Sequence, residues 1–323
     1  MRRAGENTRS AHLPGEGFAD AVAALEGAAK PDDVAGQAFA SGEAALAVVL
    51  MTFLRGGTHV VAPTNAPGVL GNVLPRFGVS ADFVDFGDLE RVRQAVRPTT
   101  KIIFVPTLSE PGMTVADIRS LYRIARQAGA LLVVDSTLAT PIVCRPLEHG
   151  ADLVLHSGAL LGGCAGGVVV GRPDLVSRLR QIGADLGAGL CCDEVPRLRD
   201  GLHTLPLRIR RMCSTAMVFA AALARHPGVR KVGYPGLPDH PGHQLARQQF
   251  DSGPEGTRFG PCVSVTPVDP GLVGALTLIK EGPPGGACTR ATVLGDEVRF
   301  TMGLEDAEDL IADVNRALDA LSR

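Results

Sequence analysis

Two patterns of apolar and polar positions alternate along the chain. Short continuous apolar runs such as "THVVAP" (58–63) and "ALLVVDS" (130–136) indicate buried strands, and segments such as "VADIRSLYRIARQAG" (115–129) carry apolar residues at helical spacing and end in glycine. Strands that alternate with helices over short links indicate an α/β protein with a doubly wound, mostly parallel sheet. The same patterns predict strands at 80–86, 101–107, 151–157 and 166–171, and helices at 20–29, 42–54, 68–78, 89–96, 205–226 and 305–322.

A change in composition divides the chain after its first two thirds. Residues 183–201 are rich in glycine, cysteine and acids, and the apolar spacing of 205–226 predicts a long connecting helix. We expect three parts: a short N-terminal arm at 1–34, a large α/β domain at 35–225 and a smaller C-terminal α/β domain at 226–323.

Charge and composition remove several classes of function. The net charge of −2 provides no basic field for nucleic acid, and the longest apolar run, 44–54, is too short to cross a bilayer. The N-terminus lacks the apolar run of a signal peptide. Seven cysteines, an odd number without zinc-ligand spacing, predict reduced thiols and no metal site. We therefore expect a cytoplasmic protein that binds neither nucleic acid nor membrane.

Two polar residues follow directly on predicted strands. Asp135 ends the run 130–136, and Ser157 ends the run 151–157. Open parallel sheets bind ligands beyond the carboxyl ends of their strands, so both residues are candidates for a ligand site. The alternative is local: Asp135 closes a turn, and Ser157 caps a helix.

Several longer stretches together point to one family. The chain contains, in order, "FASGEAAL" (39–46), "GALLVVDSTLATP" (129–141), "RPLEHGADLVLHS" (145–157), "HPGVRKVGYPGL" (226–237) and "VRFTMGLEDAEDLIADVNRAL" (298–318). In these stretches it resembles the Cys/Met-metabolism family of pyridoxal-phosphate (PLP) enzymes, which includes cystathionine γ-lyase, cystathionine γ-synthase and methionine γ-lyase. The resemblance implies the type I PLP-transferase fold, and a homodimer or homotetramer in which two subunits share each active site.

The chain departs from that family where the cofactor is anchored. Family members hold PLP on a lysine within a pattern like HSxTKxxxGH, and the aligned residues here are His156, Ser157, Ala159, Leu160 and Cys164. Leucine has no amine for a Schiff base and cannot shuttle a proton. The tyrosine that stacks on the cofactor ring is also missing, with Ala66 or a neighbour in its place, and no Tyr-x-Arg pair is present. We therefore expect no cofactor, with PLP binding weak or absent.

Other residues keep the roles that the resemblance implies. Asp135 would face the pyridine nitrogen and Ser157 the phosphate, and the helix start at Ser41-Gly42-Glu43 would offer backbone N–H groups to an anion, although Glu43 adds a carboxylate there. Arg299 would clamp a substrate α-carboxylate; its alternative is a surface or interdomain salt bridge. Glu110 takes the place of an asparagine near the substrate.

Three functions remain open. The first is a PLP-independent pseudoenzyme that partners an active paralogous PLP enzyme and binds a small amino-acid-like ligand. The second is a repurposed enzyme for a sulfur- or amino-acid-derived substrate, with speculative catalytic residues Glu110, His156, Cys164 and His203; each thiol is alternatively a small buried hydrophobe, and His203 a structural turn residue. The third is a PLP-dependent carbon–sulfur lyase whose amine comes from Lys280, near the Pro283-Pro284-Gly285-Gly286 loop.

Overall fold

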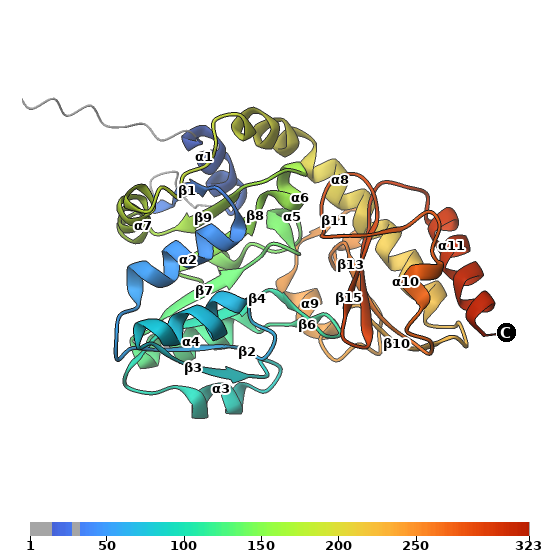
Figure 1. The fold of residues 1–323 in the computed structure, drawn as a ribbon, viewed down its shortest axis with the longest axis horizontal. Helices are drawn as coiled ribbons and strands as arrows, with labels where there is room; N and C mark the ends of the chain where they lie inside the picture. The colour runs from blue at the N-terminus through green and yellow to red at the C-terminus, as the bar shows by residue number, and fades with distance from the viewer. Residues whose placement is uncertain (1–14, 28–32, 323) are drawn as a thin grey trace, which may run out of the picture.

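A seven-stranded sheet organises the first half of the protein in this computed structural model, which describes residues 15–27 and 33–322 (Figure 1). Its strand order is β1-β9-β8-β7-β4-β2-β3, and only β9 runs antiparallel to its neighbours within this sheet. The mostly parallel sheet predicted from the alternating pattern is therefore present. The strands are β1 (Ala35–Phe39), β2 (His59–Pro63), β3 (Ser80–Val84), β4 (Thr100–Pro106), β7 (Leu131–Asp135), β8 (Leu153–Ser157) and β9 (Gly167–Gly171).

Helices cover both faces of this sheet, which is why its strands are continuous apolar runs. Neighbouring residues of one strand point to opposite faces, so that Val134 joins the core under one helical layer and Val133 the core under the other. The first layer contains α1 (Glu16–Leu25), α3 (Leu89–Ala95), α4 (Ile118–Ala128), α5 (Thr140–Val143) and part of α8 (Glu194–Leu223), and the second contains α2 (Gly42–Phe53) and α7 (Pro173–Asp185).

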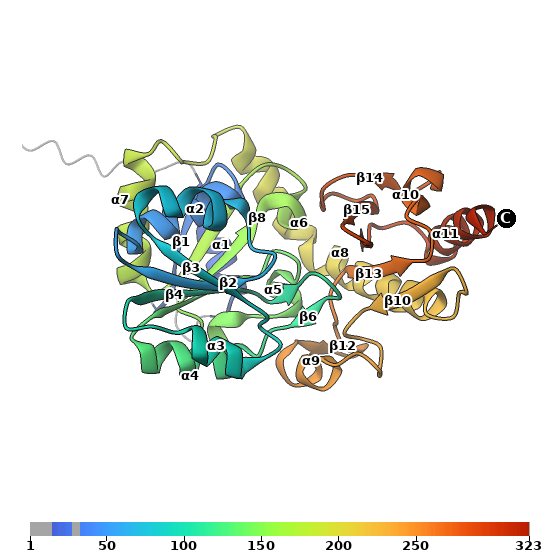
Figure 2. The same ribbon diagram turned by 60° about the horizontal axis from the view of Figure 1, so that its bottom comes forward.

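A five-stranded sheet forms the second half, in the order β10-β13-β16-β15-β14. The long helix α8 contacts α6 of the first half and β13 and α11 of the second, and runs between them in Figure 2. The elements of this half are β10 (Val229–Gly233), α9 (His243–Gln249), β11 (Ser252–Gly253), β12 (Gly256–Thr257), β13 (Cys262–Pro267), α10 (Leu272–Ala275), β14 (Lys280–Glu281), β15 (Arg290–Leu294), β16 (Glu297–Thr301) and α11 (Ala307–Leu321).

The structure differs from the predicted elements at three places. The helix predicted at 68–78 is a π-helical turn, η2 (Val69–Val73), followed by a 3-10 turn, η3 (Leu74–Phe77), because Pro75 has no N–H to donate. Helix α8 begins eleven residues before the predicted start and carries Pro206 inside it. The helix predicted at 20–29 of the arm lies earlier in the chain, as α1, whose Phe18 and Val22 are fully buried. Residues 1–14 and 28–32 of that arm lie outside the described residues.

A small hairpin and two short helical turns complete the fold. Strands β5 (Leu108–Ser109) and β6 (Thr114–Val115) pair antiparallel and extend from the end of β4 toward the second sheet. Helix α6 (Gly158–Gly162) follows β8, and η4 (Pro146–His149) precedes it. None of the helices in the described part of the chain combines the length and the apolar character that a bilayer crossing requires.

Candidate functional site

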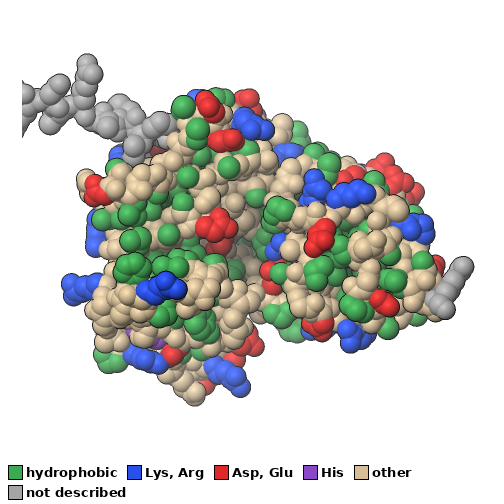
Figure 3. Space-filling model, in the orientation of Figure 1, with side chains coloured by type: hydrophobic (Ala, Val, Ile, Leu, Met, Phe, Trp, Pro, Cys, Tyr) green, Lys and Arg blue, Asp and Glu red, His purple; other side chains and the backbone are tan. Residues whose placement is uncertain are grey.

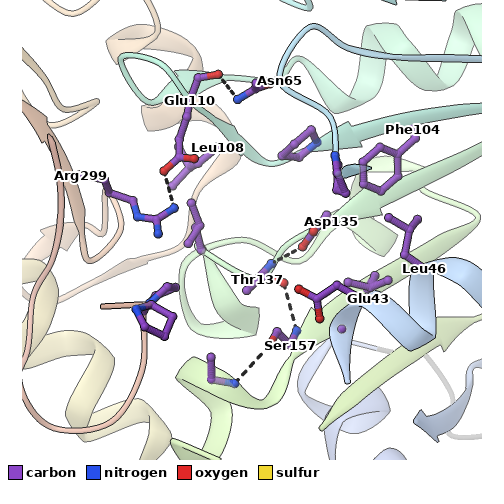
Figure 4. Close-up of a pocket in the computed structure, with 18 residues that line it drawn as sticks. Glu43, Leu46, Asn65, Phe104, Leu108, Glu110, Asp135, Thr137, Ser157 and Arg299 are labelled. Atoms are coloured by element: carbon purple, nitrogen blue, oxygen red, sulfur yellow. Dashed lines mark hydrogen bonds and ion pairs between the residues drawn. The ribbon is translucent and has the colours of Figure 1, made fainter. Parts of the chain in front are cut away.

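A pocket of about 450 Å³ lies at the carboxyl ends of the large sheet's strands, between the two halves of the protein (Figure 4). Its volume falls in the range of small-molecule sites. In the described part of the chain, its charged lining residues are three carboxylates, Glu43, Asp135 and Glu110, and one guanidinium, Arg299. Figure 3 shows acidic side chains beside the hollow between the two halves. The location is the one that the strand ends predict for a ligand.

The floor of the pocket is built by the ends of β7 and β8. Asp135 Oδ1 accepts a hydrogen bond from the Thr137 backbone N–H at 2.9 Å, and the Ser157 backbone N–H donates to Thr137 Oγ1 at 3.0 Å. Burial raises the pKa of the Asp135 carboxyl above its ordinary value, against the hydrogen bonds from Thr137, which lower it. A positively charged ring nitrogen next to Asp135 would oppose that rise, so the floor suits a pyridinium-like group.

The start of α2 forms one side of the pocket. Ser41 caps this helix by accepting the Ala44 N–H at 3.0 Å, and the first N–H groups of a helix have no partner within it. Gly42 permits the close approach to β8, because a Cβ there would lie 3.1 Å from Ser157 Cβ. Glu43 lines the same side with an exposed carboxylate. This corner therefore offers N–H donors and a negative charge together.

The opposite wall joins the two halves through one ion pair. Glu110 Oε1 accepts from Arg299 Nη1, although Glu110 follows the β5 strand of the hairpin and Arg299 lies on β16. Burial raises the pKa of the Glu110 carboxyl, and the Arg299 guanidinium opposes that rise. The structure therefore brings together seven of the predicted site residues in or beside one pocket: Ser41, Gly42, Glu43, Glu110, Asp135, Ser157 and Arg299.

His156 does not reach the pocket, contrary to its predicted catalytic role. Its side chain is fully buried, and Nε2 lies 2.7 Å from Oε1 of the equally buried Glu26, which caps α1. Nδ1 lies 3.2 Å from the Ser136 carbonyl, an obligate acceptor, so Nδ1 carries a proton. The reason is the strand period: Ser157 faces the pocket, and its neighbour must face the opposite side.

Cys164 and His203 also lie outside the pocket lining. Burial and the neighbouring Glu194 raise the pKa of the Cys164 thiol to about 11, so the thiol is protonated at neutral pH and is a poor nucleophile. His203 is exposed on α8. Of the four residues named for the repurposed enzyme, the described pocket lining therefore includes Glu110 and not His156, Cys164 or His203.

Leu160 lies next to the pocket, in α6, and is only 1% exposed. Its carbonyl accepts from Arg208 Nη1 at 3.0 Å, and its neighbour Ala159 lines the pocket. No lysine lines the pocket within residues 15–27 and 33–322. Lys280 is exposed and donates to the Thr277 carbonyl at 2.7 Å, and Lys30 lies outside the described residues.

Several lining residues carried little signal in the sequence. No sequence pattern marks Asn65 or Phe104, and Thr137 is marked only by its place two residues after Asp135. Glu26 gave no signal, because its partner His156 is 130 residues away. Outside the pocket, Cys191, Cys192 and Asp193 place three groups that can ligate a metal within 4.8 Å of one another, and all three are exposed.

The relatives found by comparison with known proteins agree with one another. Residues 3–256 match the family described as Cys/Met metabolism PLP-dependent enzyme. A canavanine gamma-lyase of Rhizobium leguminosarum bv. trifolii is 37% identical over 310 residues, which cover 87% of this chain and 77% of that protein. An L-methionine gamma-lyase of Pseudomonas putida is 36% identical over 329 residues, covering 93% and 81%. The crystal structure of cystathionine gamma-lyase from Lactobacillus plantarum complexed with L-serine superposes with a TM-score of 0.88 at 29% identity, covering 100% of this chain and 92% of that one.

These matches confirm the predicted type I PLP-transferase fold and correct one expectation. The prediction that no cofactor is used, or that PLP is weak or absent, is wrong for this family, because the matching family and fold are those of PLP-dependent enzymes. That expectation rested on Leu160, which the resemblance places at the position of the family's anchoring lysine. This chain belongs to the Cys/Met metabolism family of PLP-dependent enzymes.

Proposed function

We propose that this protein is a PLP-binding member of the γ-lyase family that holds the cofactor without a covalent bond and does not carry out lysine-dependent lyase chemistry by itself. One observation supports the proposal most: none of the described residues lining the pocket is a lysine, and Leu160 is packed beside it. The pocket itself is still present, at the strand ends where ligands bind in this type of sheet.

The residues present fit PLP at two of three points. Asp135 suits the ring nitrogen, because a half-buried carboxylate with a raised pKa gains from a neighbouring positive charge. Ser157 and the N–H groups at the start of α2 suit the phosphate, although the Glu43 carboxylate weakens that end. The third point, an amine for the aldehyde, is not supplied by the described lining residues.

The chain's own residues define what the pocket can do. When bound, PLP supplies an aldehyde that reacts with amines and a ring that stabilises negative charge on a neighbouring carbon. Asp135 would hold the ring, and Phe104 and Leu46 give the pocket apolar surface. A proton shuttle between substrate carbons needs a base in the pocket, and the Glu110 carboxylate is already paired with Arg299.

Under this proposal the chain is a binding subunit, which holds PLP but does not catalyse the lyase reaction by itself. We propose further that it assembles as a homodimer or homotetramer, or with an active paralogue whose pocket keeps the lysine. Coexpression with such a paralogue, followed by affinity purification on one tag and mass spectrometry, tests the mixed assembly. A cytoplasmic location stays a prediction.

The lyase alternative agrees with the names of the relatives. It requires an amine near the pocket, and Lys280 is held at the Thr277 carbonyl on the surface. The two proposals are separated by trapping. The purified protein is incubated with excess PLP, treated with borohydride, and its intact mass is measured.

Under the binding-subunit proposal, wild type shows no covalent adduct but retains PLP after rapid gel filtration. The variant Leu160→Lys, designed to restore an amine beside Ala159, gains the adduct. Lys280→Ala is the matched control and should behave like wild type. A wild-type adduct lost in Lys280→Ala would establish the lyase alternative.

A further inference from the structure

The Arg299 guanidinium is the most buried charged group in the wall of the pocket. Its side chain is 9% exposed, Nη2 donates to Thr292 Oγ1 at 3.1 Å, and Nη1 donates to Glu110. Nε is buried and has no hydrogen-bond partner among the described residues. A buried guanidinium next to a ligand cavity binds a carboxylate tightly, and here the chain itself supplies that carboxylate.

The carboxylate of Glu110 is held in place by the hairpin that carries it. The Glu110 carbonyl accepts from Asn65 Nδ2, and the Gly112 N–H donates to Glu297 Oε2 on β16 at 2.9 Å. His240 Nε2 lies 2.9 Å from the Gly112 carbonyl. The tip of the hairpin is therefore fastened to the second half at both backbone groups of Gly112, and Glu110 is fixed against Arg299.

A ligand carboxylate that binds Arg299 would have to displace Glu110 from this position. The displaced Glu110 would remain in a part-buried wall, where burial and, to a lesser degree, the charge of Glu297 already raise its pKa. Removing one partner from a buried ion pair is costly, because the charge that is left behind loses its compensation. Glu110 therefore disfavours the binding of carboxylate ligands to Arg299. The same ion pair keeps this wall of the pocket closed.

The rest of the pocket favours the opposite charge. Glu43 and Asp135 line it together with Glu110, and Arg299 is the one cationic side chain among the described residues that line it. With Arg299 neutralised by Glu110, the remaining charged groups are carboxylates. A primary amine without a carboxylate meets attractive charges in this pocket and no group that it must displace.

We propose that Glu110 is a specificity-determining residue that closes Arg299 to carboxylate ligands and makes the pocket a site for primary amines that lack an α-carboxylate. The inference deepens the proposed function, since it assumes that this pocket is the ligand site of the binding subunit. The test of this inference needs no PLP, so the inference and the proposed function can be refuted independently.

The test compares two ligands that differ by one carboxylate. L-methionine and the amine obtained by removing its carboxylate are titrated into the full chain without added PLP, and binding is followed by saturation-transfer NMR on the S-methyl resonance. Wild type is expected to bind the amine at least 10-fold more tightly than methionine, which corresponds to about 1.4 kcal/mol.

The variant Glu110→Gln keeps the shape and the hydrogen-bond acceptor but removes the charge. We expect methionine to bind it at least 10-fold more tightly than it binds wild type, and the amine less tightly. Glu110→Asn, with a shorter amide, should shift the two affinities in the same directions. Glu281→Gln, an exposed site outside the pocket, is the matched control and should change neither affinity.

Three results would overturn the inference. Wild type could bind methionine as tightly as the amine, wild type could fail to bind the amine, or both Glu110 variants could leave the preference unchanged while unfolding cooperatively. Loss of PLP retention with the amine preference intact would instead contradict the proposed function and leave the role of Glu110 standing.

Discussion

Two acid–base pairs join distant segments of this protein, and their surroundings differ. The Glu26–His156 pair has both side chains fully buried between α1 and β8, and the Glu110–Arg299 pair lines a pocket with side chains 20% and 9% exposed. Both pairs have one carboxylate whose pKa burial raises. A ligand can compete for the second pair and cannot reach the first. A carboxylate paired with a basic side chain therefore stabilises the packed core in one place and selects ligands in the other.

The largest expected effect concerns the enclosed pair. His156→Ala removes the partner of a fully buried carboxyl and leaves a cavity, so the free energy of unfolding should fall by about 3–5 kcal/mol. Urea denaturation followed by circular dichroism measures the change. Glu26→Gln keeps a hydrogen-bonding group next to His156 and should lose less. A loss below about 1 kcal/mol in His156→Ala would show that the pair is not part of the packed core.

The pocket pair should be less sensitive to loss of one charge. Glu110→Gln still accepts a hydrogen bond from Arg299, and the part-exposed wall can rehydrate, so we expect a loss of about 1–2 kcal/mol. Glu281→Gln is the control in the same denaturation series and should fall within about 0.5 kcal/mol of wild type. If Glu110→Gln cost as much as His156→Ala, the proposed contrast between the two pairs would disappear.

Asp135 lines the pocket with Glu110 and Arg299, and it precedes Ser136, whose carbonyl contacts His156. Its folded-state pKa is raised, so the folded protein holds this proton more tightly than the unfolded chain does. Stability from this group is therefore present below the unfolded pKa of about 4 and is lost as the pH rises through the raised folded pKa. Asp135→Asn should flatten that part of the pH–stability curve.

At neutral pH and without a ligand, Asp135→Asn should be more stable than wild type, because the amide has no charge to desolvate. Thermal unfolding across the pH series measures both effects. Asp174→Asn should change the pH dependence of stability in the opposite direction, because Arg172 lowers the pKa of the exposed Asp174 carboxyl. A pH profile of Asp135→Asn that runs parallel to wild type would contradict the assignment.

The smallest expected effect is a difference in the rate at which buried and exposed thiols react, with no change in stability. Cys191, Cys192 and Cys288 are exposed and should react first with a thiol reagent, ahead of Cys164 with its pKa of about 11. Cys144, Cys213 and Cys262 are buried and should react only on unfolding. Peptide mapping after timed labelling gives the order. Early labelling of Cys164 would reopen its role as a nucleophile.

Much of the fold was predictable because short-range patterns carry it. Continuous apolar runs at 58–63 and 130–136 identified central strands, and Asp135 and Ser157 were found because they end such strands. Strand β1 gave no such signal, since "AGQAF" contains Gly36 and Gln37 and depends on pairing with β9. Helix α8 was shortened in the prediction, because Pro206 resembles a helix start when the flanking contacts are unknown.

The amino-acid sequence by itself determined the alternation of strands and helices, the family pattern, the scarcity of lysine and the carboxylate at position 110. These follow from the periods of side-chain direction and from residue identity, which are local properties. Tertiary structure alone decided that Glu110 closes on Arg299 and that His156 turns away to Glu26. The partners in those pairs are 189 and 130 residues apart, and only the packing of the two halves and of α1 brings them together.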